Sequence, residues 1–268
     1  MPEPPGDSDA RQRLRAGMLA TWPAARELSA AELKARFPKR QLIVGWRLPT
    51  AMAEPPHDVL VAIDDDFPWS LPVVALPESE GAVTYPHIEG DGRFCLAKVG
   101  DAFDLPVGIA HVQQLVHEAN DLMLAGRTKS NEADFFAEAH SYWTLTRPAG
   151  GQYWLTQPPP GAHAIWVGAK DGNNVVLAPT KDALETWARN GARRLDTVDV
   201  ALMLRLSAPL HPLHYPSTMA QLSALATHVG ADAQLERVVT QWKARDPLPV
   251  VMMFDFEGQT ISLGGEFL

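Results

Sequence analysis

Three short strand-like runs follow one another in the first third of the chain, and they limit the fold more than any other feature. They occupy residues 42–48, 59–63 and 73–76, and Pro or Asp bounds each one. Helical periodicity over residues 11–22 precedes them. Ser29-Ala-Ala-Glu32 then forms a capping-box pattern that predicts a short helix to about Phe37. The N-terminal part is therefore expected to combine helices with a sheet.

A long amphipathic helix is predicted after this sheet. Apolar residues recur at three- and four-residue spacing over 112–123, and Gly126 is expected to form the C-terminal cap. A further helix is predicted over residues 132–143. The tryptophans Trp46, Trp69 and Trp143 are expected to pack in one core with these elements.

Proline and glycine interrupt the pattern in the middle of the chain, which predicts a domain boundary. We expect a tail over residues 1–10, a first domain over 11–147, a linker over 148–161 and a second domain over 162–268. The second domain opens with a predicted hairpin around Asp171-Gly-Asn-Asn174, and strand and helix patterns follow it. It is expected to be an α/β domain.

Charge and length exclude several classes of protein. The 268 residues carry a net charge of -9, from 23 basic and 32 acidic side chains, so a nucleic-acid partner is not expected. No apolar run reaches the length that spans a membrane, and the N-terminus is not a secretory signal. We therefore expect a cytoplasmic protein with no membrane partner.

Cys95 is the only cysteine. An internal disulfide is impossible, and a thiolate zinc cluster is excluded. His111 and His117 are six residues apart, which does not place both on one helix face at metal distance. His211 and His214 in a Pro-rich loop are weak candidates for a metal site. We expect no metal and no cofactor.

One segment, residues 67–124, has an informative order of motifs. The residues that carry it are Phe67-Pro68, Pro72, Tyr85-Pro86-His87, Asp91-Gly92 and Cys95-Leu96. This order resembles the ubiquitin-conjugating enzyme family, over roughly residues 10–145. The resemblance implies an α+β fold with an antiparallel strand meander flanked by helices, and a catalytic cysteine at Cys95.

Two departures from the common family pattern resemble its bacterial branch. His87 stands where the family has Asn, and Phe103-Asp-Leu-Pro106 replaces a Trp-x-Pro motif. The resemblance implies a ubiquitin-like protein, a ThiF-type activating enzyme (separate, or fused after residue 268) and a protein target as partners, in a bacterial antiphage pathway. Residues 162–268 are then a candidate for the linker domain that joins the two enzymes in fused members. No Gly-rich adenylation loop occurs, so the chain by itself is not expected to activate anything.

Cys95 suits acyl transfer because a thiolate can attack one thioester and later leave when an amine attacks. The Gly-containing turn before it, with Asp91 and Gly92, would keep the thiol near the surface. The competing hypothesis is that a lone cysteine is buried and acts as a small hydrophobic residue.

The motif supplies further candidates. Tyr85 and Pro86 directly precede His87. His87 is expected either to donate a neutral imidazole N–H to the oxyanion or to brace the loop. The resemblance implies a role for Asp101 and Asp104 in orienting the substrate lysine, but the favoured interpretation is that they stabilise the start of the following helix.

Asp64-Asp65-Asp66 either binds a divalent cation or is a solvated loop, and the solvated loop is the favoured interpretation.

Three functional hypotheses remain. The first is a conjugating enzyme that carries a ubiquitin-like protein on Cys95. The second is a non-catalytic protein-binding module with the same fold, and the retained cysteine argues against it. The third is a cysteine hydrolase with Cys95 and His87, for which no orienting Asp or Asn is recognisable in the sequence.

Overall fold

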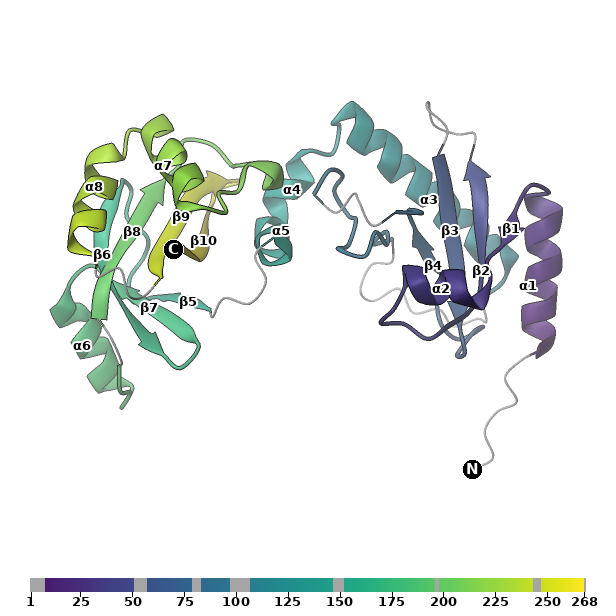
Figure 1. Ribbon diagram of the computed structural model, residues 1–268, viewed down its shortest axis with the longest axis horizontal. Helices are drawn as coiled ribbons and strands as arrows, with labels where there is room; N and C mark the ends of the chain where they lie inside the picture. Colours follow the sequence, from purple (N-terminus) through teal and green to yellow (C-terminus); the bar gives the residue numbers. More distant parts are fainter. Residues whose placement is uncertain are drawn as a thin grey trace. The chain divides into compact units, whose positions relative to one another are not determined.

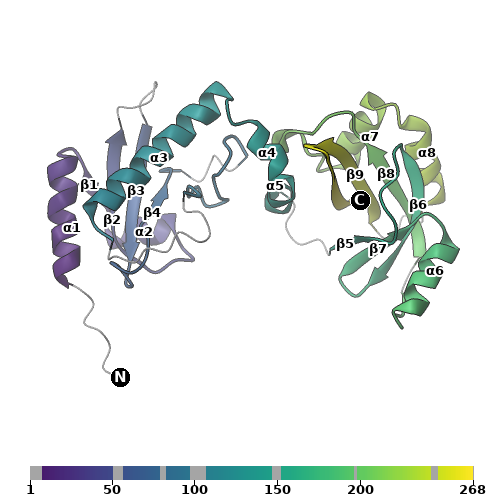
Figure 2. The same cartoon turned by 180° about the vertical axis from the view of Figure 1, so that it is seen from behind.

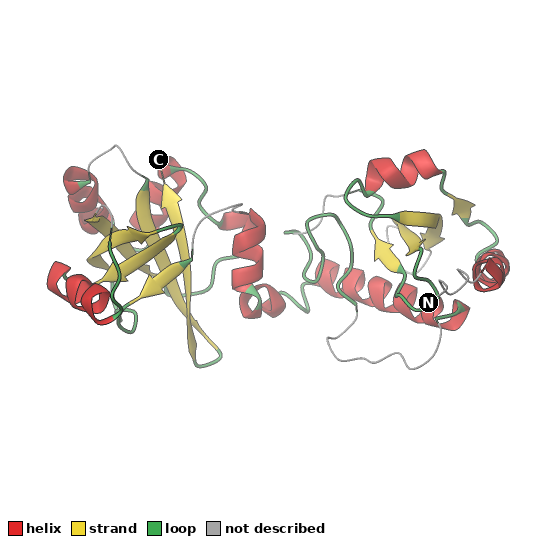
Figure 3. Cartoon of the chain, turned by 90° about the horizontal axis from the view of Figure 1, so that it is seen from below, coloured by secondary structure: helices red, strands yellow, loops and turns green. Residues whose placement is uncertain are grey.

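The structure is a computed structural model that describes residues 8–50, 57–78, 83–96, 107–146, 152–195, 198–242 and 247–267. The chain divides into two compact units, Met1–Asp134 and Phe135–Leu268, each with its own sheet (Figure 1). Figure 3 shows helices packed against the strands of each unit.

The first unit contains a four-stranded antiparallel sheet in the order β1-β2-β3-β4. Its strands are β1 (Arg26–Glu27), β2 (Leu42–Thr50), β3 (His57–Asp64) and β4 (Val73–Ala75). The three strand-like runs of the sequence are thus confirmed as neighbouring strands. β4 lies at one edge of the sheet, and this edge carries the candidate site.

Helices cover both faces of this sheet, so its central strand β3 is buried on both sides. Helices α1 (Ser8–Thr21) and α3 (Ile109–Thr128) pack on one face with Val59, Val61 and Ile63. Helix α2 (Ala30–Arg36) packs on the other face with Leu60 and Ala62. Figure 2 shows α3 along its face of the sheet. The alternation follows from the two-residue period of a strand.

The predicted capping box of α2 is present. The backbone N–H of Ser29 donates to Oε2 of Glu32 at 2.8 Å, and the N–H of Glu32 donates to Oγ of Ser29 at 3.3 Å. The hydrogen bond from Arg26, followed by those from Ser29, lowers the pKa of Glu32 to about 2. The ionised carboxylate therefore holds the first turn of α2 across the neutral range.

The interpretation of Gly126 as a helix cap is wrong. Helix α3 continues to Thr128, and Lys129 closes it in the left-handed conformation with φ 57°. A β-carbon at Gly126 would lie 2.5 Å from Cδ1 of Tyr85. Glycine is therefore needed inside the helix because the ring of Tyr85 packs directly on the helix backbone.

The second unit has a six-stranded sheet in the order β10-β9-β8-β6-β7-β5. The pairs β5–β7 and β8–β9 are parallel, and the remaining pairs are antiparallel. Its strands are β5 (Tyr153–Leu155), β6 (Ala164–Asp171), β7 (Asn174–Ala178), β8 (Val198–Arg205), β9 (Leu248–Phe256) and β10 (Gln259–Phe267). After β5 it contains the helices α6 (Lys181–Asn190), η1 (Pro212–His214), α7 (Met219–His228) and α8 (Asp232–Gln241). The hairpin predicted at Asp171–Asn174 is the β6–β7 turn.

This second sheet curls until its two outer strands meet. The ring of Tyr153 on β5 packs so closely on β10 that a β-carbon at Gly264 would lie 2.2 Å from its Cγ. The curled inner face holds an apolar cluster of Trp166, Val175, Leu177, Ala201, Met203, Val251 and Met253. Gly264 is therefore the position at which the sheet can close.

The predicted helix over 132–143 is two helices, α4 (Ala133–Ala137) and α5 (Ala139–Thr146). Trp143 on α5 packs in the core of the second unit, where its Nε1 donates to the carbonyl oxygen of Gly264 at 2.6 Å. The contacts within each unit thus place the division of the chain after Asp134, before the linker expected at 148–161. Placing Trp143 in the first core was wrong, because its hydrogen-bond acceptor and its apolar neighbours belong to β10 and its surroundings.

Trp46 is 1% exposed and lies in the first core as expected, but Trp69 is 73% exposed. The expectation for Trp69 is wrong because it follows Phe67-Pro68, and Phe67 takes the buried place in this turn.

Replacing Gly264 with alanine should destabilise the second unit by about 1–3 kcal/mol, because the added methyl group overlaps the Tyr153 ring. Thermal unfolding followed by near-UV circular dichroism measures the change. Gly161→Ala is the matched control, since nothing lies within 4 Å of its β-carbon position. Equal unfolding temperatures for the two variants would contradict this packing.

Candidate active site

Residues 87–95 form a hairpin that presents Cys95 at its end. The N–H of Cys95 donates to the carbonyl oxygen of His87 at 2.8 Å, and the N–H of Glu89 donates to that of Arg93 at 2.8 Å. Ile88 and Phe94 pair between these bonds, and both side chains are buried in the first core. Cys95 itself is exposed. The hypothesis that Cys95 is a buried hydrophobic residue is therefore wrong.

The same hairpin is paired to the edge of the sheet, and the pairing reaches as far as Phe94. Phe94 N–H donates to the carbonyl oxygen of Val74, and Leu76 N–H donates to that of Gly92, both at 2.9 Å. Alternate residues of this edge face the hairpin, so the next one before Val74 is Pro72. The nitrogen of Pro72 has no hydrogen to donate. The ladder therefore loses a donor beyond Phe94, and Cys95 follows the last hydrogen bond of the described ladder to β4.

Two residues of the hairpin have positive φ. Gly92, at 77°, forms the turn that the Asp91-Gly92 motif predicts. His87, at 60°, is a non-glycine residue in the left-handed region, which costs on the order of 1–3 kcal/mol and persists only where surrounding contacts hold it. Its carbonyl bond to Cys95 is one such contact.

Charged side chains brace the outer end of the hairpin. Nε of Arg93 lies 2.9 and 2.8 Å from the two carboxylate oxygens of Asp91, and Nη2 of Arg93 lies 3.4 Å from Glu89. Nε of Arg40 lies 3.7 Å from Asp91. Partial burial of the Asp91 carboxyl opposes its ionisation, but the hydrogen bonds and charge of Arg93 prevail and lower its pKa. Asp91 is thus a structural residue of the hairpin.

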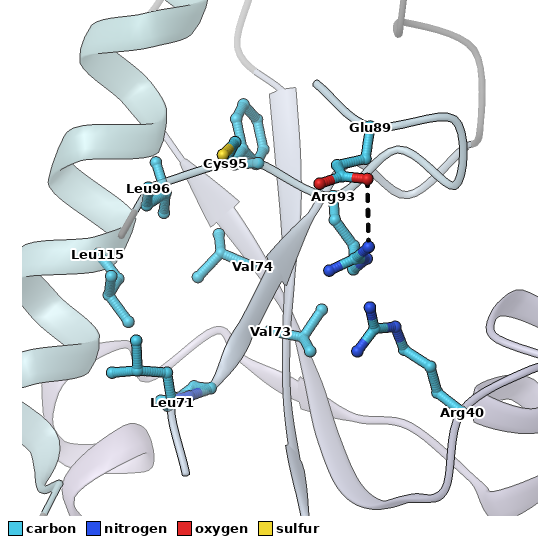
Figure 4. A pocket seen from close by; sticks show the side chains of 11 residues that line it. Arg40, Leu71, Val73, Val74, Glu89, Arg93, Cys95, Leu96 and Leu115 are labelled. Atoms are coloured by element: carbon cyan, nitrogen blue, oxygen red, sulfur yellow. Dashed lines mark ion pairs between the residues drawn. The ribbon is translucent and has the colours of Figure 1, made fainter. Parts of the chain in front are cut away.

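A pocket of about 250 Å³ opens beside Cys95. Leu71, Leu96 and Leu115 line one side, and Arg40, Arg93 and Glu89 line the other (Figure 4). Val73, Val74, Pro72, Phe94 and Cys95 complete the lining. The pocket therefore offers apolar surface and charge next to the sulfur.

The side chain of His87 reaches an acidic residue that the sequence analysis missed. Its Nε2 lies 3.0 Å from Oδ2 of Asp134 on α4. The two residues are 47 positions apart, and only the way α3 returns the chain to the hairpin brings them together. No local pattern could have indicated Asp134.

The other motif residues have different places. Pro86 is buried, and Tyr85 packs on Gly126 of α3. Both residues therefore hold the chain in place immediately before His87. Asp101 and Asp104 lie outside the described residues.

The acidic run before β4 makes bonds within the protein. Asp64 accepts hydrogen bonds from the Ser70 hydroxyl and from the N–H of Asp66, and Asp65 pairs with Arg11 at 2.7 Å. In the parts of the chain that the structure describes, no group of three or more His, Cys, Asp or Glu residues is arranged to hold a metal ion. These bonds suit the interpretation of the run as a loop rather than a cation site.

The remaining histidine candidates also make local contacts. Nδ1 of His111 accepts from the N–H of Gly108 at 3.1 Å, at the start of α3. His117 lies 3.4 Å from Asp121 on the exposed side of the same helix. Nδ1 of His211 accepts from the N–H of Leu213 at 3.2 Å. These bonds give each histidine a role in local structure.

A four-stranded antiparallel meander with helices on both faces, and an exposed cysteine on a hairpin beside its edge strand, are consistent with a ubiquitin-conjugating-like domain. Residues 19–149, slightly less than half of the chain, match prokaryotic E2 family B, and this match supports a bacterial ubiquitin-conjugating-like family. The match extends through α5, which packs in the second unit. No curated protein matches the chain.

The family assigns a general role in ubiquitin-like conjugation, and proteins of this kind work with a ubiquitin-like protein and an activating enzyme. Among the described helices, none has both the length and the apolar character needed to cross a membrane.

Replacing Asp91 with asparagine should weaken the hairpin by about 0.2–1 kcal/mol at neutral pH, as expected for a partly exposed ion pair. Because folding lowers the pKa of Asp91, its contribution is complete above the unfolded value of about 3.9 and is lost as the pH falls below it. Amide hydrogen-exchange protection of Phe94 and Cys95 should differ between the proteins at about pH 7, and this difference should be smaller at about pH 3.

Asp171→Asn is the control, since it removes an Arg–Asp pair of the second unit, 2.6 Å long in the wild type. Loss of hairpin protection in this control, or an Asp91→Asn effect that persists undiminished in acid, would contradict the assignment.

Proposed function

We propose that this protein accepts a ubiquitin-like protein as a thioester on Cys95 and transfers it to an amine of a target protein. The observation that carries the proposal is the exposure of Cys95 at the end of the paired hairpin. The thiol is held on a fixed backbone, yet a flexible protein tail can reach it.

The proposed chemistry consists of two acyl transfers at one sulfur. In the first, the Cys95 thiolate attacks the thioester carbonyl presented by an activating enzyme; the new C–S bond forms, and the enzyme's own thiolate leaves. In the second, a target amine attacks the same carbonyl, a C–N bond forms, and the Cys95 thiolate leaves. Sulfur suits both steps because a thiolate is a good nucleophile and a better leaving group than an alkoxide.

The pocket beside Cys95 is the proposed place for the residues next to the reacting carbonyl. Its walls combine leucine side chains with Arg40, Arg93 and Glu89. A glycine-terminated tail approaching the sulfur would pass this surface, with its backbone and any apolar side chain against the leucines.

The wider setting of the proposal is a bacterial antiviral conjugation pathway with a ThiF-type activating enzyme. The support is the resemblance of the Tyr85-Pro86-His87 and Cys95-Leu96 motifs to that branch. Residues 162–268 are proposed to link the conjugating-like unit to the activating enzyme, whether that enzyme is separate or fused. A pull-down with the purified activating enzyme tests this link. The intact chain should bind the enzyme.

A cysteine hydrolase is the second candidate, because His87 now has an orienting carboxylate in Asp134. A hydrolase would cleave a ubiquitin-like protein from a C-terminal fusion without ATP or an activating enzyme, whereas the proposed carrier would not. The exposed Cys95 argues against the binding-module hypothesis, because a binding module has no use for a thiol.

The serine and alanine variants of Cys95 should separate acyl transfer from simple binding. With ATP, activating enzyme and ubiquitin-like protein, Cys95→Ala should form no covalent adduct and no conjugate. Cys95→Ser should form an oxyester that resists thiols and discharges slowly, because an alkoxide leaves less readily than a thiolate. Non-reducing gels, with and without thiol or hydroxide, measure both adducts.

Thermal unfolding of the variants serves as the control for folding. An alanine variant that still forms conjugates at the wild-type rate would contradict the proposal, and ATP-independent cleavage of a fusion by the wild type would favour the hydrolase.

A further inference from the structure

The geometry points to Asp134 as a positioning residue that makes His87 the base for the incoming amine. This inference rests on the proposed function, since it concerns the step in which a target amine attacks the Cys95 thioester. It gives His87 a proton-accepting role in place of the oxyanion contact or the loop-bracing role that the sequence left open.

The first step is the assignment of the proton between the two side chains. Nε2 of His87 and Oδ2 of Asp134 are 3.0 Å apart, within hydrogen-bond distance. An ionised carboxylate can only accept, so the hydrogen of this bond belongs to Nε2. A neutral imidazole has one N–H, and Nδ1 then carries the lone pair.

The consequence is that a neutral His87 acts at Nδ1 as an acceptor. Donation to an oxyanion from Nδ1 would require the doubly protonated ring. A carboxylate that orients an imidazole and stabilises the imidazolium formed after proton uptake is the arrangement that makes histidine an effective base. Asp134 is placed to do both for His87.

The second step is the position of His87 relative to the sulfur. The backbones of His87 and Cys95 face each other across the hairpin, joined by the 2.8 Å bond from Cys95 N–H. The adjacent pair, Ile88 and Phe94, is buried and anchors both strands of the hairpin in the first core. The left-handed φ of His87 is held between this anchor and Asp134. The base and the nucleophile-bearing residue are thus fixed at the same end of one hairpin.

The proton transfers balance without any further reactant. A target ammonium gives one proton to Nδ1 of His87 and becomes the amine, which attacks the thioester carbonyl. The C–N bond forms, the C–S bond breaks, and Sγ of Cys95 leaves as a thiolate. The proton on His87 then passes to solvent or to the thiolate, and the amide nitrogen loses its extra proton to solvent. The ring returns to its neutral state.

The test compares two amines in single-turnover discharge of the Cys95 thioester. Free lysine is an ammonium at neutral pH and needs a base, whereas hydroxylamine is already uncharged. For Asp134→Asn we expect discharge to lysine to slow by about 10-fold or more, within the range that general bases contribute. Discharge to hydroxylamine should change much less. Asp134→Glu keeps a carboxylate and should restore part of the rate with lysine.

Asp121→Asn is the matched control, because it removes the partner of another histidine, His117, on the exposed side of α3. It should leave discharge to both amines unchanged. Nitrogen-15 NMR of the imidazole rings gives a measurement that needs no variant. Where the His87 ring of the wild type is neutral, its hydrogen should be on Nε2.

Either of two kinetic results would overturn the inference: equal rates for wild type and Asp134→Asn, or an equal slowing with lysine and hydroxylamine, which marks a general loss of site structure. A neutral His87 with its hydrogen on Nδ1 would overturn it as well. The discharge rates are measured on protein that has already formed the thioester, and the NMR measurement is made on the wild type alone. If the wild type never forms a thioester with active partners, the proposed function itself fails, so the two failures are distinct.

Discussion

The pairing of the 87–95 hairpin to the edge of β4 is the interaction on which the site depends. It aligns the hairpin with the sheet through the hydrogen bonds of Phe94 and Gly92, and burial of Phe94 and Ile88 contributes roughly 1.5–3 kcal/mol for each side chain. The ladder reaches its end opposite Pro72, which has no N–H. The backbone is therefore paired to the sheet up to the residue before Cys95, and the thiol is exposed where this pairing stops.

Packing in the rest of the first unit supports this edge of the sheet. Helix α3 covers the sheet face that holds Phe94, and its glycine at position 126 lets Tyr85 pack against the helix backbone at the entry to the hairpin. The same helix leads the chain to α4, whose Asp134 returns to His87. The hairpin that carries His87 and Cys95, and the carboxylate of Asp134, thus come from segments that are distant in sequence and are joined by one helix.

Local sequence patterns predicted the elements of this fold well and their partners poorly. The capping box at Ser29, the strand runs and the Asp91-Gly92 turn depend on neighbouring residues, and all three are present in the structure. Gly126 and Trp143 were misassigned because their roles come from Tyr85 and Gly264, residues far away in the chain. Asp134 was missed for the same physical reason. A hydrogen bond between segments 47 residues apart leaves no periodic signal.

The measurement that tests the central claim most directly is the intact mass of the wild-type protein under non-reducing conditions. The chain is incubated with ATP, a purified activating enzyme and the corresponding ubiquitin-like protein, and the reaction is stopped in acid. An acyl carrier at Cys95 gains the mass of one ubiquitin-like protein less one water, and added thiol removes it. An unchanged mass, in a reaction where the activating enzyme has formed its own thioester, would contradict a carrier role for Cys95.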